Sequence, residues 1–431
     1  MRRRDIRKGT IYTAVFFVVA FIAIWVFKPS KTGKDKKDKV SERGVVWSDT
    51  LTNNSSDYEL LYPMEKDIER FMNKWNIRGM SVAVMRHDSL LYAKGFGWSD
   101  EQKRTLMEAG TIGRIASASK LVTATAVMKL IEEGKLSFDT KVFGDSGVLN
   151  DKDFTESVKD KRAFDITVDN LLRHAGGFTL GAGDPMFNTA EIIKAKNLSK
   201  NPDNHDLVKI VLGRKLGFTP GVGHRYSNFG YMLLSLVIER VTGQSYWDYV
   251  NKNVLEPAGC YNFRPATNYL ADRLENETHY YAPDDELVEE FTGSGRMVTR
   301  CYGGADFNAL MGAGGWLTSA ADLARFVASI NGDPGVKDIL KQESVNLMSA
   351  REGDEKLCFG WTDSDGKGNR TRSGTLSSAH ALIMTYDDGE TWVMTTNTGV
   401  WTGYKFTSSL RNLINTLRPR YRSAFPDRNL F

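Results

Sequence analysis

The feature that most constrains the fold is an apolar run at residues 121–131, within the segment RIASASKLVTATAVMKLIEEGKL at residues 114–136. Apart from Lys129, this run presents apolar side chains or threonine on every face, which predicts a helix buried on all sides. Gly134 follows at a position where glycine commonly ends a helix. Ser117 and Lys120 stand at the start of the same helix, so the sequence places a hydroxyl and an amine beside the core.

Strand-like segments occur near both ends of the chain, and helix-like segments lie between them. Residues 80–100, MSVAVMRHDSLLYAKGFGWSD, predict two strands joined in a hairpin. Residues 378–398 predict a second hairpin that turns at Asp388-Gly389. This order predicts an α+β fold in which both ends of the chain build one antiparallel sheet, flanked by helices, with a helical lobe inserted between them.

The N-terminus predicts a membrane anchor. Residues 10–27 are eighteen residues without a charge, which as a helix would be about 27 Å long, close to the roughly 30 Å hydrocarbon core of a bilayer. We expect an uncleaved transmembrane signal anchor, with a cleaved signal peptide as the alternative. The expected organisation is a basic tail at residues 1–9, the anchor at 10–27, a polar linker at 28–60, one folded domain at 61–420 and a C-terminal tail at 421–431.

Charge and cysteine content argue against nucleic-acid binding and against a framework of zinc sites or disulfides. Residues 1–40 hold eleven Lys and Arg against three Asp, so the rest of the chain is net negative and is a poor candidate for binding nucleic acid. Cys260, Cys301 and Cys358 lie far apart and form no C-x-x-C pair. Neither a zinc site nor a disulfide framework is therefore indicated.

Ser117 and Lys120 form the pattern S-x-x-K, whose spacing puts both side chains on one face of a helix. A serine becomes a good nucleophile when a base removes its proton, and a lysine can be that base if burial lowers its pKa from about 10.4. Taken alone, the pattern is equally typical of a capping serine beside a surface lysine. A second copy, Ser364 to Lys367, contains Asp-Gly, which predicts a turn instead of a helix.

Two further motifs carry polar groups that suit a cleft. Tyr226 and Asn228 follow a Pro-Gly loop and precede an apolar helix, and such side chains can relay a proton and contact a substrate amide. The segment RSGT at residues 372–375 predicts a strand with a glycine where a substrate or another backbone comes close. Its Arg372 offers a fork for a carboxylate, although an edge-strand arginine in solvent has the same pattern.

The order S-x-x-K, Y-x-N and basic-x-Gly resembles the serine β-lactamase and penicillin-binding-protein superfamily, in particular the class C β-lactamase-like branch with D-alanyl-D-alanine carboxypeptidases and esterases. The segments LLRHAGGF around His174 and GGWLTSAADLARF from residue 314 add to the resemblance as features of the fold. The resemblance implies Ser117 as the acyl-forming nucleophile, Lys120 as its base, Tyr226 as a proton relay and Asn228 as a contact to the substrate amide.

The resemblance further implies that Arg372, Ser373, Gly374 and Thr375 bind substrate, with the N–H groups of Ser117 and Thr375 forming an oxyanion hole. It implies no metal and no cofactor. One departure concerns Arg372, because the family usually has Lys or His there. Arginine stays charged at any working pH, so it can bind a carboxylate but cannot carry a proton.

The patterns predict a membrane-anchored serine hydrolase, and the resemblance implies that it acts through an acyl-enzyme on a D-amino-acid peptide or a small ester or amide. A β-lactamase proper is the alternative with the same chemistry. A non-catalytic protein that binds cell-wall peptides on the same fold is the alternative of another class. The family's usual place on or outside the membrane leads us to expect the domain outside the cytoplasm, with a small molecule or peptide as partner and the oligomeric state open.

Overall fold

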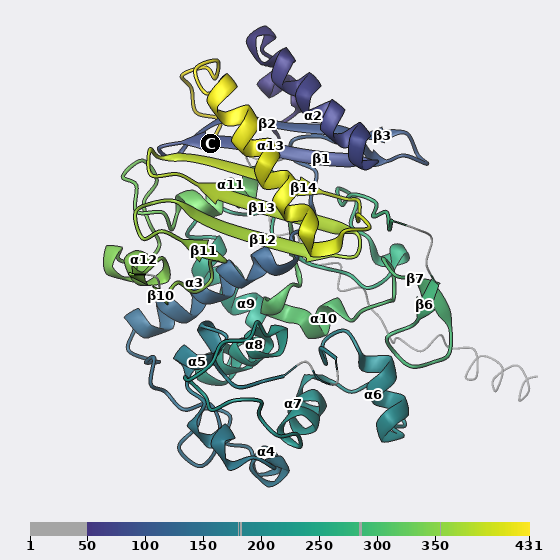
Figure 1. Ribbon diagram of the computed structural model, residues 1–431, viewed down its shortest axis with the longest axis vertical. Helices are drawn as coiled ribbons and strands as arrows, with labels where there is room; N and C mark the ends of the chain where they lie inside the picture. The colour runs from purple at the N-terminus through teal and green to yellow at the C-terminus, as the bar shows by residue number, and fades with distance from the viewer. Residues whose placement is uncertain (1–49, 180, 182, 284–286, 354) are drawn as a thin grey trace, which may run out of the picture. The chain divides into compact units, whose positions relative to one another are not determined.

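The computed structural model describes residues 50–179, 181, 183–283, 287–353 and 355–431 (Figure 1). One antiparallel sheet of seven strands organises this part of the chain. In spatial order the strands are β11 (Asp363–Ser364), β12 (Arg370–Leu376), β13 (Ala379–Thr385), β14 (Glu390–Thr396), β1 (Gly79–Arg86), β2 (Ser89–Asp100) and β3 (Thr105–Leu106).

Both ends of the chain supply this sheet, as expected. β1 pairs with β14 from Met80 opposite Thr396 to Arg86 opposite Glu390, so early and late strands meet inside the sheet. The hairpin between β13 and β14 turns at Asp388-Gly389, where Gly389 has a φ of +81° that glycine adopts without strain. The structure therefore supports the α+β class.

The two faces of the sheet pack against different helices, because side chains alternate along each strand. In β1, Val82 and Val84 pack on the face that α2 (Tyr62–Trp75) and α13 (Phe406–Tyr421) cover. Ala83 and Met85 point to the opposite face, toward α11 (Ala320–Ala328) and α3 (Ser119–Glu132). Figure 1 shows α2 and α13 above the sheet and α3 below it.

A helical lobe lies beyond α3 in Figure 1, where α8 packs against both α3 and α5. The remaining helices are α4 (Lys152–Ser157), α5 (Val168–Leu172), α6 (Thr189–Lys196), α7 (Asn204–Leu212), α8 (Asn228–Thr242), α9 (Tyr246–Val250), α10 (Phe307–Leu310) and α12 (Gln342–Met348). Short helical turns are η2 (Asn53–Ser56), η3 (Glu59–Leu61), η4 (Ala116–Ala118), η5 (Lys161–Asp165), η6 (Asn251–Leu255), η7 (Leu270–Asp272), η8 (Met311–Ala313) and η9 (Gly403–Lys405).

Three small sheets complete the fold. They pair β8 (Trp316–Thr318) with β4 (Gly113–Arg114) and β5 (Arg264–Pro265), β6 (Leu287–Glu289) with β7 (Met297–Thr299), and β9 (Arg351–Glu352) with β10 (Glu355–Lys356). The pairing of β4 with β8 fixes the chain just before η4.

The predicted fold class needs one correction, which concerns the membrane. Within the described residues, no helix has both the length and the apolar character that a bilayer span requires. Residues 1–49, which include the predicted span at 10–27, lie outside the part that the structure describes. The structure therefore supports the α+β class, and the transmembrane helix predicted with it finds no support among the described residues.

Residues before α2 and residues after α13 also pack against the sheet. Asn53, in the predicted linker, pairs with Gly95 of β2: the Asn53 amide donates to the Gly95 carbonyl at 3.1 Å and accepts from its N–H at 2.8 Å. In the predicted C-terminal tail, the Leu430 N–H donates to the carbonyl of Leu90 at 2.9 Å. Both segments therefore contribute to the folded unit.

Candidate active site

Ser117 lies on the turn η4, which leads directly into α3. Nearly every face of α3 is buried, as its sequence predicts, and Lys120 is 0% exposed. Nζ of Lys120 lies 3.2 Å from Oγ of Ser117. Ala116 has a φ of 50°, which is unfavourable for a residue with a Cβ, so backbone strain is stored next to Ser117.

Three oxygen atoms surround the amine of Lys120. The amine donates to Oδ1 of Asn228 at 2.6 Å and to the carbonyl oxygen of Ala313, and it lies 3.2 Å from Oγ of Ser117. The first two oxygens only accept hydrogen bonds. A neutral Lys120 would therefore use its two N–H groups on Asn228 and Ala313 and keep its lone pair for the hydroxyl of Ser117.

Burial sets the proton affinity of this amine. It lowers the pKa of Lys120 from 10.5 to about 8, because the charged form loses its hydration in the core. The positive charge of Arg372 adds to this lowering of the pKa, while Tyr226 and Asp184 oppose it. At pH 7 a pKa of about 8 leaves roughly a tenth of the molecules with a neutral lysine, against less than a thousandth at the ordinary value.

Tyr226 completes a hydrogen-bonded group around Ser117. Its hydroxyl donates to Oγ of Ser117 at 2.6 Å, and its ring lies 4.8 Å from Nζ of Lys120. Tyr226 is 40% exposed, but partial desolvation near Lys120 would by itself raise its pKa. The positive charges of Lys120 and Arg372 outweigh this and hold that pKa below its usual value. The pKa values of Tyr226 and Lys120 therefore move toward each other, which suits two groups that exchange a proton.

His174 supports the loop that carries Tyr226. Its Nδ1 accepts from the N–H of Ser227 at 3.2 Å, and its ring lies 4.5 Å from the ring of Tyr226. Burial and the nearby positive charges hold the pKa of His174 well below its usual range, so the ring is neutral. These contacts make His174 a structural residue, because an Nδ1 that accepts from the backbone is not free to act as a base.

Arg372 packs against the turn that carries Ser117. It is 2% exposed, and its Nε donates to the carbonyl oxygen of Ser117 at 2.8 Å, with Nη2 donating to the same oxygen. The sequence predicted a fork for a substrate carboxylate at this position. In the structure Nε and Nη2 instead bind the Ser117 carbonyl, because β12 runs directly against η4.

Gly374 explains how strand and turn come so close. A Cβ at this position would lie 2.2 Å from the carbonyl oxygen of Ile115 and 3.0 Å from the backbone nitrogens of Ser117 and Ala118. Of the two partners that the sequence allowed for this glycine, a substrate or another backbone, the structure shows the backbone of η4. A larger residue would push β12 off the turn.

Ser373 and Thr375 present their side chains to the other face of β12. Ser373 is paired with Leu382, which packs under α13, whereas Gly374 is paired with Ala381, which packs on the α3 side. The Ser373 side chain therefore points away from Ser117, contrary to the substrate contact that was predicted for it. What β12 can offer a substrate here is its backbone edge, since β11 pairs only with the start of β12.

Two groups at the site carry no signal in the sequence. Asp184 accepts from Nδ2 of Asn228 at 2.7 Å across 44 residues, and the carbonyl of Ala313 contacts Lys120 across 193 residues. A backbone carbonyl leaves no trace in a side-chain pattern. Asp184 stands in a Gly- and Pro-containing loop, where an aspartate is ordinary turn chemistry.

A cavity of about 560 Å³ lies beyond the end of β12. Trp75, Tyr281, Tyr302 and Trp401 line it together with polar residues. Gly399 also lines it, and a Cβ on Gly399 would meet the backbone of the turn between β12 and β13. The cavity therefore adjoins the far end of the strand that passes Ser117.

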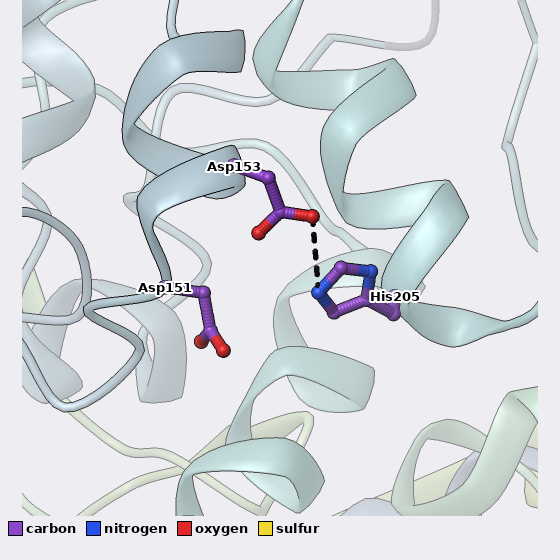
Figure 2. Close-up of side chains that lie close together, drawn as sticks. All are labelled: Asp151, Asp153 and His205. Atoms are coloured by element: carbon purple, nitrogen blue, oxygen red, sulfur yellow. Dashed lines mark ion pairs between the residues drawn. The ribbon is translucent and has the colours of Figure 1, made fainter.

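A group of potential metal ligands lies in the helical lobe. Asp151, Asp153 and His205 can place ligand atoms within 4.8 Å of one another, and Figure 2 shows the ion pair of Asp153 with His205, 3.5 Å apart. However, Arg240 pairs with Asp151 at 2.7 Å and Lys209 with Asp153 at 3.6 Å. Because protein cations already neutralise both carboxylates, we assign no metal site to this group.

The chain belongs to the Beta-lactamase family, whose model matches residues 64–411. This confirms the predicted membership of the serine β-lactamase and penicillin-binding-protein superfamily.

Known relatives agree with this assignment. The chain is 26% identical to Protein flp of Staphylococcus aureus (strain COL) over 338 residues, which are 78% of this chain and 61% of that protein. It is 24% identical to Penicillin-binding protein 4* of Bacillus subtilis (strain 168) over 308 residues, 68% of this chain and 61% of that protein. The chain thus spans about three fifths of the length of these curated relatives.

A solved structure shows the same fold. The D-amino acid amidase from Ochrobactrum anthropi SV3, complexed with L-phenylalanine amide, matches with a TM-score of 0.65. The match covers 85% of this chain and 99% of that chain at 17% sequence identity.

Proposed function

We propose that this protein hydrolyses a D-amino-acid amide or peptide, or a small ester, through an acyl-enzyme on Ser117. The observation that carries the proposal is the buried amine of Lys120, 3.2 Å from Oγ of Ser117, with its pKa lowered to about 8. A solvated lysine would hold its proton at neutral pH and could not activate the serine.

Acylation begins when Oγ of Ser117 attacks the carbonyl carbon of the substrate. The hydroxyl proton passes to Lys120, directly or through the phenol of Tyr226, and the carbonyl oxygen becomes an oxyanion. The N–H groups of Ser117 and Thr375 hold that oxyanion in this proposal, since Gly374 keeps β12 against η4. The bond to the leaving group then breaks as Tyr226 gives it a proton and recovers one from Lys120.

Deacylation reverses these roles with water as the nucleophile. The water oxygen attacks the ester carbon while its proton passes to the pair of Lys120 and Tyr226. The bond to Oγ of Ser117 breaks, and the serine recovers its proton from the same pair. The free acid leaves, and the enzyme returns to its starting protonation state.

The choice of substrate follows from the site and from the relatives. Arg372 is 2% exposed and directs Nε and Nη2 at the Ser117 carbonyl, so an amide or ester suits the site better than a substrate that needs a cation for a terminal carboxylate. The fold shared with a D-amino acid amidase supports an amide. The backbone edge of β12 supports an extended peptide that adds to the strand.

Intact mass spectrometry of residues 45–431 tests the proposal. The protein is incubated with a D-amino acid amide, an activated ester, a D-alanyl-D-alanine peptide and a fluorescent penicillin, beside the Ser117→Ala variant. We expect a Ser117-dependent adduct or product with the amide or the ester. Fast turnover of penicillin would favour a β-lactamase instead. A biological activity that Ser117→Ala retains would favour a non-catalytic binding protein.

The location of the domain outside the cytoplasm stays a prediction, which protease accessibility in intact cells can check.

A further inference from the structure

Asp184 holds the amide of Asn228 on the side away from Lys120. Nδ2 of Asn228 donates to Oδ2 of Asp184 at 2.7 Å, while Oδ1 of Asn228 accepts from Nζ of Lys120 at 2.6 Å. The other oxygen of Asp184 accepts from the N–H of Met186 at 3.0 Å. The half-buried carboxylate is thus fixed by its own loop and reaches the amine of Lys120 through one amide group.

This contact determines which end of the amide faces the lysine. An asparagine amide can turn by 180° and exchange its oxygen with its NH₂ group. An ionised carboxylate only accepts hydrogen bonds, so Asp184 selects the NH₂ end of Asn228 and leaves the oxygen for Lys120. In the turned orientation the NH₂ group would face the amine as a donor. It would then attract the lone pair that Lys120 needs for Ser117.

We propose that Asp184 is a positioning residue for the hydrolase reaction, which locks Asn228 so that the lone pair of Lys120 points at Ser117. The inference rests on the proposed function of Ser117 and Lys120. Asp184 acts through Asn228 and touches none of the three groups that exchange protons.

The negative charge of Asp184 has a second, separable effect. It opposes the lowering of the Lys120 pKa, since a nearby carboxylate favours the charged amine. The reaction requires the pair of Lys120 and Tyr226 to lose one proton before acylation. Removal of the charge therefore moves the acidic limb of kcat/KM to lower pH, whereas a purely structural defect would lower the rate without moving that limb.

Two substitutions separate orientation from charge. Asp184→Asn keeps an oxygen that can accept from Asn228 but removes the charge, and Asp184→Ala removes both. The control, Glu191→Gln, removes an exposed carboxylate of α6 in the same lobe. The pH profile of kcat/KM for acylation is measured for each variant with a D-amino acid amide and with its N-acetyl derivative, and thermal unfolding checks the fold.

We expect both Asp184 variants to shift the acidic limb to lower pH. We expect Asp184→Ala alone to lose roughly 10- to 100-fold in the plateau of kcat/KM, equally for both substrates, as a misplaced catalytic group does. Glu191→Gln should match the wild type.

Two results would overturn the inference while the wild type still forms its Ser117 adduct. One is an unchanged limb and plateau in both Asp184 variants. The other is a loss confined to the substrate with a free α-amine, which would make Asp184 a ligand for the substrate ammonium. A wild type that forms no adduct with either substrate would instead count against the proposed function.

Discussion

The chain contains the pattern S-x-x-K twice, and the two copies have different surroundings. Ser117 and Lys120 lie at the start of α3, where the amine is 0% exposed and its pKa falls to about 8. Ser364 ends β11, and Lys367 follows a turn and is exposed. The hydroxyl of Ser364 donates to the carbonyl of Ser349 at 2.8 Å.

The difference teaches that burial, and not spacing, lowers the pKa of the lysine in this pattern. The helix in the first copy brings hydroxyl and amine together, and the core around it removes the hydration that would keep the lysine charged. The turn in the second copy separates the two groups and leaves the lysine in water. The second copy is therefore an internal control for the first.

The largest difference in activity should be between substitutions of the two serines. Ser117→Ala removes the nucleophile, and we expect the acyl adduct to vanish and kcat/KM to fall by roughly 10⁶-fold. Ser364→Ala removes the same hydroxyl from the second copy and should leave turnover unchanged. Mass spectrometry and steady-state kinetics measure both, and an adduct on Ser117→Ala would refute the assignment of the nucleophile.

Substituting the two lysines should give a smaller difference in rate than substituting the two serines, because Tyr226 can still relay a proton when Lys120 is absent. We expect Lys120→Met, which keeps most of the buried volume, to lower the rate of acylation by roughly 10²- to 10⁴-fold. Lys367→Met should have no effect on that rate. Stopped-flow acylation with an activated ester measures both, with thermal unfolding as the check of folding. A rate near wild type in Lys120→Met would assign the base to Tyr226 alone.

Arg372 should matter for every substrate, because it contacts the carbonyl of Ser117 and not a substrate group. Arg372→Ala should weaken transition-state binding by roughly 1.5–3 kcal/mol, the scale of a hydrogen bond to a charged group. We expect equal losses in kcat/KM for a neutral ester and for a carboxylate-bearing substrate, with Arg372→Lys recovering part of each. A loss confined to the carboxylate-bearing substrate would restore the role that the sequence suggested.

The last prediction concerns the pH dependence that the buried amine of Lys120 gives to the unsubstituted protein. Lys120 acts when it is deprotonated, so kcat/KM should rise with pH, level off above about 8 and fall by about tenfold for each pH unit below that value. A lysine at the ordinary pKa of a solvated amine would place this limb near 10.4. A profile of kcat/KM between pH 5 and 10 measures it, and a flat profile through pH 8 would show that Lys120 does not limit the reaction.

Local patterns were enough to predict much of this molecule. The unbroken apolar run predicted the buried helix α3, and Gly134 has the positive φ of 70° expected at its end. The hairpins at both ends of the chain predicted the central sheet, because alternation and turn residues act within a few positions. The order of the three motifs predicted the family, which the match over residues 64–411 confirms.

Contacts between distant segments were not predictable in this way. The sequence led us to predict that Arg372 and Ser373 contact a substrate. In the structure Arg372 donates to the Ser117 carbonyl, and Ser373 lies on the other face of β12. The direction in which a strand residue points depends on which neighbour the strand pairs with, and that pairing is set by the whole sheet.

The sequence by itself determined the chemical groups and the rigid helix on which Ser117 and Lys120 stand. Only the tertiary structure decided the surroundings of these two groups. The core around α3 lowers the pKa of Lys120, the loop of Asp184 orients Asn228, and the carbonyl of Ala313 binds the amine. The physical reason is range: helix geometry is fixed within one turn of the chain, whereas desolvation and hydrogen-bond direction depend on every segment that packs around the site.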